Sequence, residues 1–163
     1  MPESWIDRWS GGSSLERDDR ARLESISTRG RTFEAGQVLV FEEDDAPLMF
    51  FVERGWAAAV RDLADGSMQI LDLFLAGQII GLREITSPDA ISSYRALTDL
   101  DVRILRKSEM QKLIEHSTSI RDRVFQAIAR EEAWLLERIT MLGQRDAAQC
   151  LAHLMLELAD RLA

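Results

Sequence analysis

The chain has 163 residues, of which 46% are hydrophobic and 29% are charged, a balance typical of a folded globular protein. Its 20 basic and 28 acidic residues give a net charge of −8, which disfavours direct binding to a nucleic-acid backbone. A single cysteine, Cys150, excludes an internal disulfide and an iron–sulfur cluster held by several thiolates of one chain. With no run of about 20 apolar residues and no signal-peptide pattern, we expect a cytoplasmic protein that does not enter a membrane.

The first 30 residues predict a preamble with one short helix. Ser13 and Glu16 have the spacing of a capping box, in which each side chain bonds to a free backbone N–H of the first turn. A thin apolar stripe that ends at Ile26 follows, so we expect an amphipathic helix near residues 14–27.

Residues 31–107 predict short strands separated by glycines. Gly55, Gly66 and Gly77 are spaced 11 residues apart, and Asp65-Gly66 suits a two-residue hairpin turn. Such spacing favours an antiparallel sandwich, jelly roll or barrel over a βαβ sheet. The runs rich in β-forming residues are 38–41, 48–52, 56–60, 68–75, 79–80, 91–97 and 102–105.

After residue 107 the pattern becomes helical. Ser108 and Gln111 have capping-box spacing at the start of a short helix. Residues 119–142 contain no Gly or Pro and predict a helix about 36 Å long, which Gly143 ends or kinks. Asp146 is the expected N-cap of a last helix whose leucines recur on one side.

The long helix carries an apolar stripe with coiled-coil spacing. The stripe has two interpretations: two copies meet along it in a parallel dimer, or it is buried in the core of one molecule. A second apolar set, which includes Trp134 and Met141, lies outside this stripe and is expected to pack on the β domain. When Phe125 is assigned to heptad position a, the a and d positions are Phe125, Ile128, Glu132, Leu135, Ile139 and Leu142.

Several short sequence motifs, in this order, resemble those of the Crp/Fnr superfamily of bacterial transcription regulators. The resemblance covers roughly residues 20–163 and implies an α+β fold, an antiparallel β-roll or jelly roll of the cyclic-nucleotide-binding type with flanking helices and a long C-terminal dimerisation helix. The matching motifs are Phe33-x-Ala35-Gly36-Gln37-x-Leu39, Phe50-Phe51-Val52-x-x-Gly55, Asp65-Gly66, Gly77-x-x-x-Gly81, Arg95-Ala96-Leu97-Thr98 and Ala152-His153-Leu154-x-Leu156-Glu157-Leu158.

The resemblance also implies a domain plan. Residues 1–30 form the preamble, 31–118 the sensor roll, 119–142 the dimerisation helix, and 144–163 the first helix of a DNA-binding domain, with a hinge at Gly143. The family continues with a winged helix-turn-helix, so we expect either a truncated regulator or a stand-alone sensor. The expected partners are a second copy, DNA only through a domain missing from this chain, and a small-molecule effector of unknown identity.

The resemblance locates the effector pocket after Gly81. Members that bind a cyclic nucleotide have a Glu for the ribose and an Arg followed by Ser or Thr that clamps the phosphate. This chain has Leu82 at the Glu position and Ala90 and Ile91 at the clamp positions, and a turn glycine is replaced by Glu43. A buried phosphate without its Arg costs several kcal/mol, so we expect no response to cyclic AMP or cyclic GMP.

Seven residues near this loop are the pocket candidates, and each has a purely structural alternative. Arg95 could instead bridge a strand and a loop, Arg83-Glu84 could be a solvated surface pair, and Ser92-Ser93 could reflect strand alternation. An anionic effector, an apolar effector or no effector stays open. The candidates are Gly81, Leu82, Arg83, Glu84, Ser92, Ser93 and Arg95.

Other functional classes find less support in the sequence. A cupin-type enzyme needs histidine and carboxylate metal ligands inside its barrel, and residues 31–107 contain no histidine. His116 and His153 lie on predicted helices outside the roll, so we expect no metal, haem or other cofactor and no enzymatic activity. A cyclic-nucleotide-binding regulatory module without DNA binding is the remaining alternative.

Overall fold

The structure is a computed structural model that describes residues 4–11, 15–27, 30–144 and 146–162. The chain forms two compact units, Met1–Val124 and Phe125–Ala163, and each is described by itself. The helices are α1 (Trp5–Ser10), α2 (Arg17–Ile26), α3 (Lys107–His116), α4 (Thr118–Gln144) and α5 (Ala147–Leu162). The strands are β1 (Arg31–Phe33), β2 (Val38–Val40), β3 (Leu48–Arg54), β4 (Ala57–Asp62), β5 (Met68–Phe74), β6 (Ile79–Ile80), β7 (Ser93–Ala96) and β8 (Leu100–Arg106).

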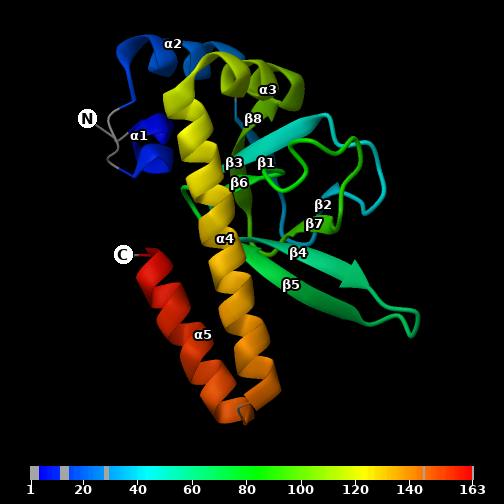
Figure 1. Ribbon diagram of the computed structural model, residues 1–163. Helices are drawn as coiled ribbons and strands as arrows, with labels where there is room; N and C mark the ends of the chain where they lie inside the picture. Colours follow the sequence, from blue (N-terminus) through cyan, green and yellow to red (C-terminus); the bar gives the residue numbers. More distant parts are fainter. Residues whose placement is uncertain (1–3, 12–14, 28–29, 145, 163) are drawn as a thin grey trace. The chain divides into compact units, whose positions relative to one another are not determined.

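The first unit contains two four-stranded antiparallel sheets (Figure 1). One sheet has the order β1-β8-β3-β6 and the other has the order β2-β7-β4-β5. Every strand pair is antiparallel, and the many crossovers between strands distant in sequence give a roll rather than a meander. The predicted α+β fold with an antiparallel jelly roll is therefore confirmed.

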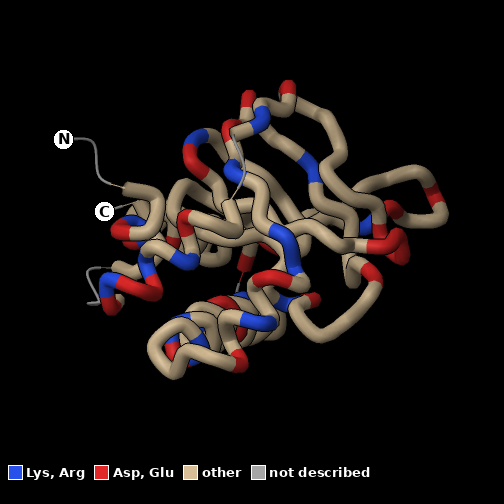
Figure 2. The backbone as a smooth tube through the Cα atoms, turned by 90° about the horizontal axis from the view of Figure 1, so that it is seen from above, with Lys and Arg blue, Asp and Glu red and all other residues tan. Residues whose placement is uncertain are grey.

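Charged residues are distributed over the whole described chain rather than gathered by sign. Figure 2 shows Lys and Arg interspersed with Asp and Glu along the backbone. None of the described helices combines the length and the hydrophobicity that crossing a bilayer requires.

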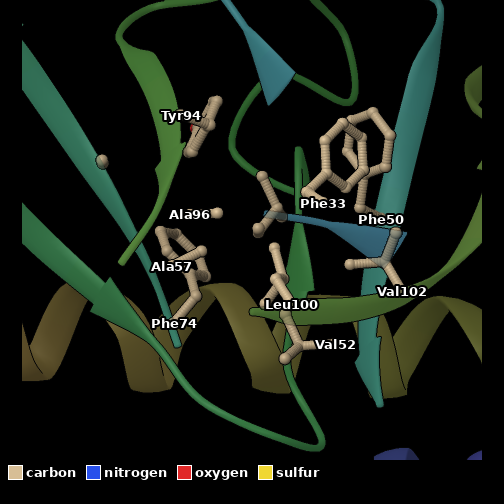
Figure 3. Packing of buried hydrophobic residues seen from close by; sticks show 11 residues of the cluster. Phe33, Phe50, Val52, Ala57, Phe74, Tyr94, Ala96, Leu100 and Val102 are labelled. Carbon is tan, nitrogen blue, oxygen red and sulfur yellow. The ribbon is translucent and has the colours of Figure 1, made fainter. Parts of the chain in front are cut away.

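The core of the roll lies between the two sheets (Figure 3). Phe50 of β3 meets Phe33 of β1 edge to face at 6.1 Å, and Phe74 of β5 meets Tyr94 of β7 at 5.7 Å. Small residues such as Ala57 on β4 leave room for these rings. Each buried ring contributes about 1.5–3 kcal/mol of hydrophobic stabilisation, which fixes the strand registers that position the loops.

The turn between β4 and β5 is longer than the predicted two-residue turn. Five residues separate the paired Asp62 and Met68, and only Gly66 has a positive φ, +83°. The Asp65 carboxylate accepts hydrogen bonds from the hydroxyl and the backbone N–H of Ser67, which lowers the pKa of Asp65. These side-chain bonds stabilise the wider turn.

The N-terminal helices differ in part from the prediction. α1 precedes the helix expected near residues 14–27, and its Trp5 packs on Phe51 of β3 with ring centres 5.2 Å apart. The backbone carbonyl of Trp9 accepts hydrogen bonds from the buried Arg123 guanidinium. α2 begins after Glu16 without a side-chain cap, and the predicted cap Ser13 lies outside the described residues.

The C-terminal helices follow the predicted order with shifted ends. α3 begins at Lys107, so Ser108 lies inside the helix and the capping-box prediction is wrong. α4 continues through Gly143, which does not end the helix as predicted. The prediction for Asp146 is confirmed, because its carboxylate accepts from the backbone N–H of Gln149 at 2.9 Å.

Candidate functional site

The loop that joins β6 to β7 contains most of the predicted pocket residues. It begins at Gly81, whose φ is +96° and at which an added Cβ would lie 3.3 Å from Cγ of Met49 on β3. Leu82, at the position where cyclic-nucleotide binders have a Glu, is 1% exposed. The site therefore starts with a buried apolar side chain instead of an acceptor for a ribose hydroxyl.

Glu84 is a buried group, not one half of a solvated surface pair. Only 1% of the residue is exposed. Its Oε1 accepts a hydrogen bond from the Tyr94 hydroxyl at 2.5 Å and a longer one from the Ile91 backbone N–H at 3.3 Å. Its Oε2 is also buried and has no hydrogen-bond partner among the described residues. The alternative of an exposed Arg83-Glu84 pair is wrong, since each side chain is held by a different partner.

The Arg83 side chain binds to strand β5 and is not free to bind a ligand. Its guanidinium forms an ion pair with Asp72 of β5, whose side chain is 2% exposed. It also lies 5.6 Å from the centre of the Phe74 ring. The other Asp72 oxygen accepts from the Leu73 backbone N–H at 2.8 Å. This pair is internal, so the charge of Arg83 is already matched by a carboxylate.

Tyr94 is a buried partner of Glu84 that the sequence analysis did not single out. Burial, together with the charge and the hydrogen bond of Glu84, raises the pKa of Tyr94 far above its usual value. The phenol therefore stays protonated and acts as a donor. Tyr94 is the only tyrosine of the chain, which is the one signal that could have drawn attention to it.

The other candidates are scattered around the loop. Ser92 and Ser93 are both buried, so their exposure does not alternate, and Ser93 Oγ accepts from the Glu42 backbone N–H at 2.9 Å. Arg95 is half-buried on β7, and its buried Nε makes no hydrogen bond to any described residue. Ser92 contacts Tyr94, the partner of Glu84, whereas no contact between Arg95 and Glu84 is found among the described residues.

The clamp positions carry no charge. Ala90 is 3% exposed, and its backbone bonds to the turn of Glu43 and Asp44, with N···O distances of 2.9 and 3.0 Å. Glu43 has a φ of +67°, the conformation that favours the glycine expected there by the resemblance. Ile91 is half-exposed. Nothing at these two positions can form the bidentate bonds that an arginine makes with a phosphate.

The second unit is a helical hairpin in which α5 runs back along the C-terminal part of α4 (Figure 1). Glu157 of α5 accepts two hydrogen bonds from Arg138 of α4, at 2.6 and 3.1 Å, and one from Arg161 at 2.8 Å. The Arg161 guanidinium lies 4.2 Å from the centre of the Trp134 ring. Within this unit, Trp134 therefore packs on α5, a partner that the sequence analysis did not foresee.

Most of the predicted seam of α4 lies away from these contacts, although Leu142 lines the same cavity as Arg138 and Glu157. Phe125 is 58% exposed, Ile139 65% and Leu142 76%, and Glu132 is exposed as well. The two remaining seam positions, Ile128 and Leu135, are half-buried. The alternative of a stripe buried in the core of one molecule does not describe these exposed side chains.

Among the described residues, no group of three or more His, Cys, Asp or Glu side chains could hold a metal ion. His116 is an exposed helix residue whose Nδ1 lies 2.7 Å from the Lys112 carbonyl oxygen.

Comparisons with known proteins agree with this geometry. A model of the family described as the cyclic nucleotide-binding domain matches residues 30–117, more than half of the chain. The chain is 25% identical over 142 residues to the transcriptional regulatory protein btr of Bordetella pertussis, covering 87% of this chain and 59% of that protein. It is 27% identical over 150 residues to the nitrogen fixation regulation protein FixK of Bradyrhizobium diazoefficiens, covering 88% and 61%.

The solved structure of FixK2 from Bradyrhizobium japonicum has the same fold. It aligns with a TM-score of 0.77 at 23% identity, over 85% of this chain and 68% of that one. The chain spans about three fifths of the length of the curated relatives it matches. The chain belongs to the cyclic nucleotide-binding domain family.

Proposed function

We propose that the chain is the sensor and dimerisation region of a Crp/Fnr-type DNA-binding transcriptional regulator that does not respond to a cyclic nucleotide. Two relatives are named as regulators of transcription and a third as a regulator of nitrogen fixation, which supports the general class. DNA recognition is assigned to a part of the regulator outside residues 1–163, and α5 to the first helix of that DNA-binding part. The protein would work in the cytoplasm, where its DNA target lies.

The exposed seam of α4 is the observation that carries the proposal. Phe125, Ile139 and Leu142 present large apolar side chains to solvent at heptad spacing. A second copy is the simplest cover, because in a parallel pair each seam residue meets its own counterpart. Glu132 in the middle of the seam sets the register at some cost in stability.

The pocket chemistry supports the lack of a cyclic nucleotide. Leu82 and Ala90 replace the two side chains that would recognise ribose and phosphate, and both are buried. Desolvating a cyclic phosphate against these apolar groups leaves its charge unpaired. A change in another effector or partner would act by altering how the two α4 helices meet, with Gly143 as the proposed hinge between α4 and α5.

Sedimentation velocity at tens of micromolar tests both parts in one experiment. The wild type, with a fluorescent cyclic AMP analogue in the sample, should sediment as a dimer of the 18.5 kDa chain without carrying the dye. Ile139→Glu should sediment as a monomer, because it sets two charges against each other on the seam. Leu156→Glu, at a residue of α5 that is 70% exposed, is the matched control and should remain dimeric.

A monomeric wild type would contradict the proposal that the seam is a dimer interface. A dye that sediments with the protein would contradict the assignment of Leu82 and Ala90 to the recognition positions. Equal dissociation of the Ile139 and Leu156 variants would move the interface away from the seam.

A further inference from the structure

Glu84 lies where a bound ligand would present its negative charge. By the resemblance, the phosphate of a cyclic nucleotide is held at the positions of Ala90 and Ile91. In this structure the Ile91 backbone N–H donates to Glu84 Oε1 at 3.3 Å, and the Tyr94 hydroxyl donates to the same oxygen at 2.5 Å. We propose that the Glu84 carboxyl group is a built-in ligand that occupies the effector site and orders its loop without an effector.

Because Glu84 is buried, the two hydrogen-bond donors determine the position of its carboxyl group. A carboxyl group that is 1% exposed loses its hydration, so the donors that remain determine where it can lie. The two donors that reach Glu84 are 7 and 10 residues further along the chain, at the end of the loop and on β7. Glu84 therefore ties the beginning of the loop to its end, which is the contact that a bound phosphate would otherwise make from outside.

The cations that contact the two ends of the loop already have partners. Arg83 pairs with Asp72, and Arg61, whose guanidinium donates to the Ile91 carbonyl oxygen at 3.3 Å, pairs with Glu42. The buried side chains of Leu82 and Ala90 offer no polar atom to an entering anion. The site accepts a small carboxylate or phosphate only after the Glu84 side chain is removed.

This inference rests on the proposed function, since it concerns the same pocket. It adds that the roll is held in one state by its own side chain, so the regulator needs no small anionic effector. The oligomeric state does not enter the argument. A chain that proved monomeric would overturn the seam and leave the role of Glu84 to be decided by its own test.

Amide hydrogen exchange followed by NMR on the full chain is that test. Glu84→Ala should lower the protection of the Ile91 amide about tenfold, because it removes one partly buried hydrogen bond. The amides that pair β7 with β4 should keep their protection. In Glu84→Gln, which retains an acceptor oxygen, the protection of the Ile91 amide should lie between that of the wild type and that of Glu84→Ala. Glu34→Ala, which removes an exposed carboxylate elsewhere on the roll, is the matched control and should match the wild type.

Chemical rescue separates an anion site from a merely structural side chain. Sodium acetate should restore the protection of Ile91 in Glu84→Ala, whereas sodium chloride at equal ionic strength should not. Unchanged protection of Ile91 in Glu84→Ala, or failure of acetate to restore it, would overturn the proposal. If Glu84→Ala does not fold, Tyr94→Phe replaces it: loss of the phenol donor should raise Ile91 exchange by a smaller factor, and no change would equally overturn the proposal.

Discussion

Single backbone positions set the geometry of the roll, and Gly55 is the most constrained of them. Its φ is +91°, and an added Cβ would lie 2.2 Å from the carbonyl oxygen of Asp99. Gly66 has a similar φ of +83°, but its missing Cβ would meet nothing within 4 Å. The pair therefore separates the conformational cost of a side chain at positive φ from the cost of a steric clash.

We expect Gly55→Ala to lower the free energy of unfolding by about 2–4 kcal/mol, since the strained φ and the forced backbone shift both contribute. Gly66→Ala should cost only about 1 kcal/mol, from φ alone. Urea unfolding followed by circular dichroism measures both. Equal losses for the two variants would contradict the close contact with Asp99.

At the same scale, the sequence identified the pocket loop but not its internal partners. The resemblance led to Gly81, Arg83 and Glu84 because they belong to, or directly follow, a glycine motif of the family. It could not reveal that Arg83 pairs with Asp72 or that Glu84 accepts a hydrogen bond from Tyr94. Asp72 and Tyr94 lie on strands whose pairing is set by tertiary packing. Adjacent Arg and Glu residues usually form a solvated pair. Only their burial in the structure distinguishes such a pair from two side chains that are bound to separate internal partners.

At the scale of elements, the α4–α5 hairpin depends on one buried carboxylate. Burial tends to raise the pKa of Glu157, but hydrogen bonds from Arg138 and Arg161 outweigh it, so the pKa lies below its ordinary value of 4.5. A folded-state pKa below the unfolded one means that ionised Glu157 stabilises the hairpin above pH 4.5. This stabilisation is lost as the pH falls through the folded-state pKa.

Glu157→Gln should therefore destabilise the hairpin by about 2 kcal/mol at pH 7, because it leaves two guanidinium groups without their carboxylate. The difference from wild type should shrink as the pH is lowered from 5 to 3. Amide exchange of α5, corrected for intrinsic rates, gives the free energies. Glu109→Gln, which breaks an exposed pair with Lys112, is the control and should change stability by less than about 0.5 kcal/mol. A constant difference across this pH range would argue against the ion pairs.

Elements marked by an apolar run or by a long Gly-free segment could be predicted whatever their length, and elements without such a mark could not. The seven predicted runs correspond to β2–β8, and the Gly-free segment corresponds to α4. The three-residue β1 and six-residue α1 are too short to give a period, and they form because Phe33 and Trp5 are buried against the sheets. Capping signals were unreliable: Asp146 caps α5, whereas Ser108 lies inside α3.

At the scale of the whole molecule, the compact units divide within α4 rather than at its start. The first unit ends at Val124 and the second begins at Phe125, so a single helix belongs to both. Sequence periodicity describes such a helix as one element and cannot locate this boundary. The exposed seam begins at the same place, which links the division of the molecule to the proposed dimer.

The charge of the whole molecule leads to a prediction about DNA. The net charge is −8, and Figure 2 shows basic residues interspersed with acidic ones along the described chain. Binding to a duplex draws its salt-dependent free energy from clustered Lys and Arg that displace counterions, and a dimer of this chain would carry twice the negative charge. We expect no change in the fluorescence anisotropy of a labelled 30-base-pair duplex with tens of micromolar protein at 50 mM salt. A winged-helix protein that binds the same duplex serves as the positive control. Micromolar binding that weakens steeply as salt is added would contradict the assignment of DNA recognition to a part of the regulator outside residues 1–163.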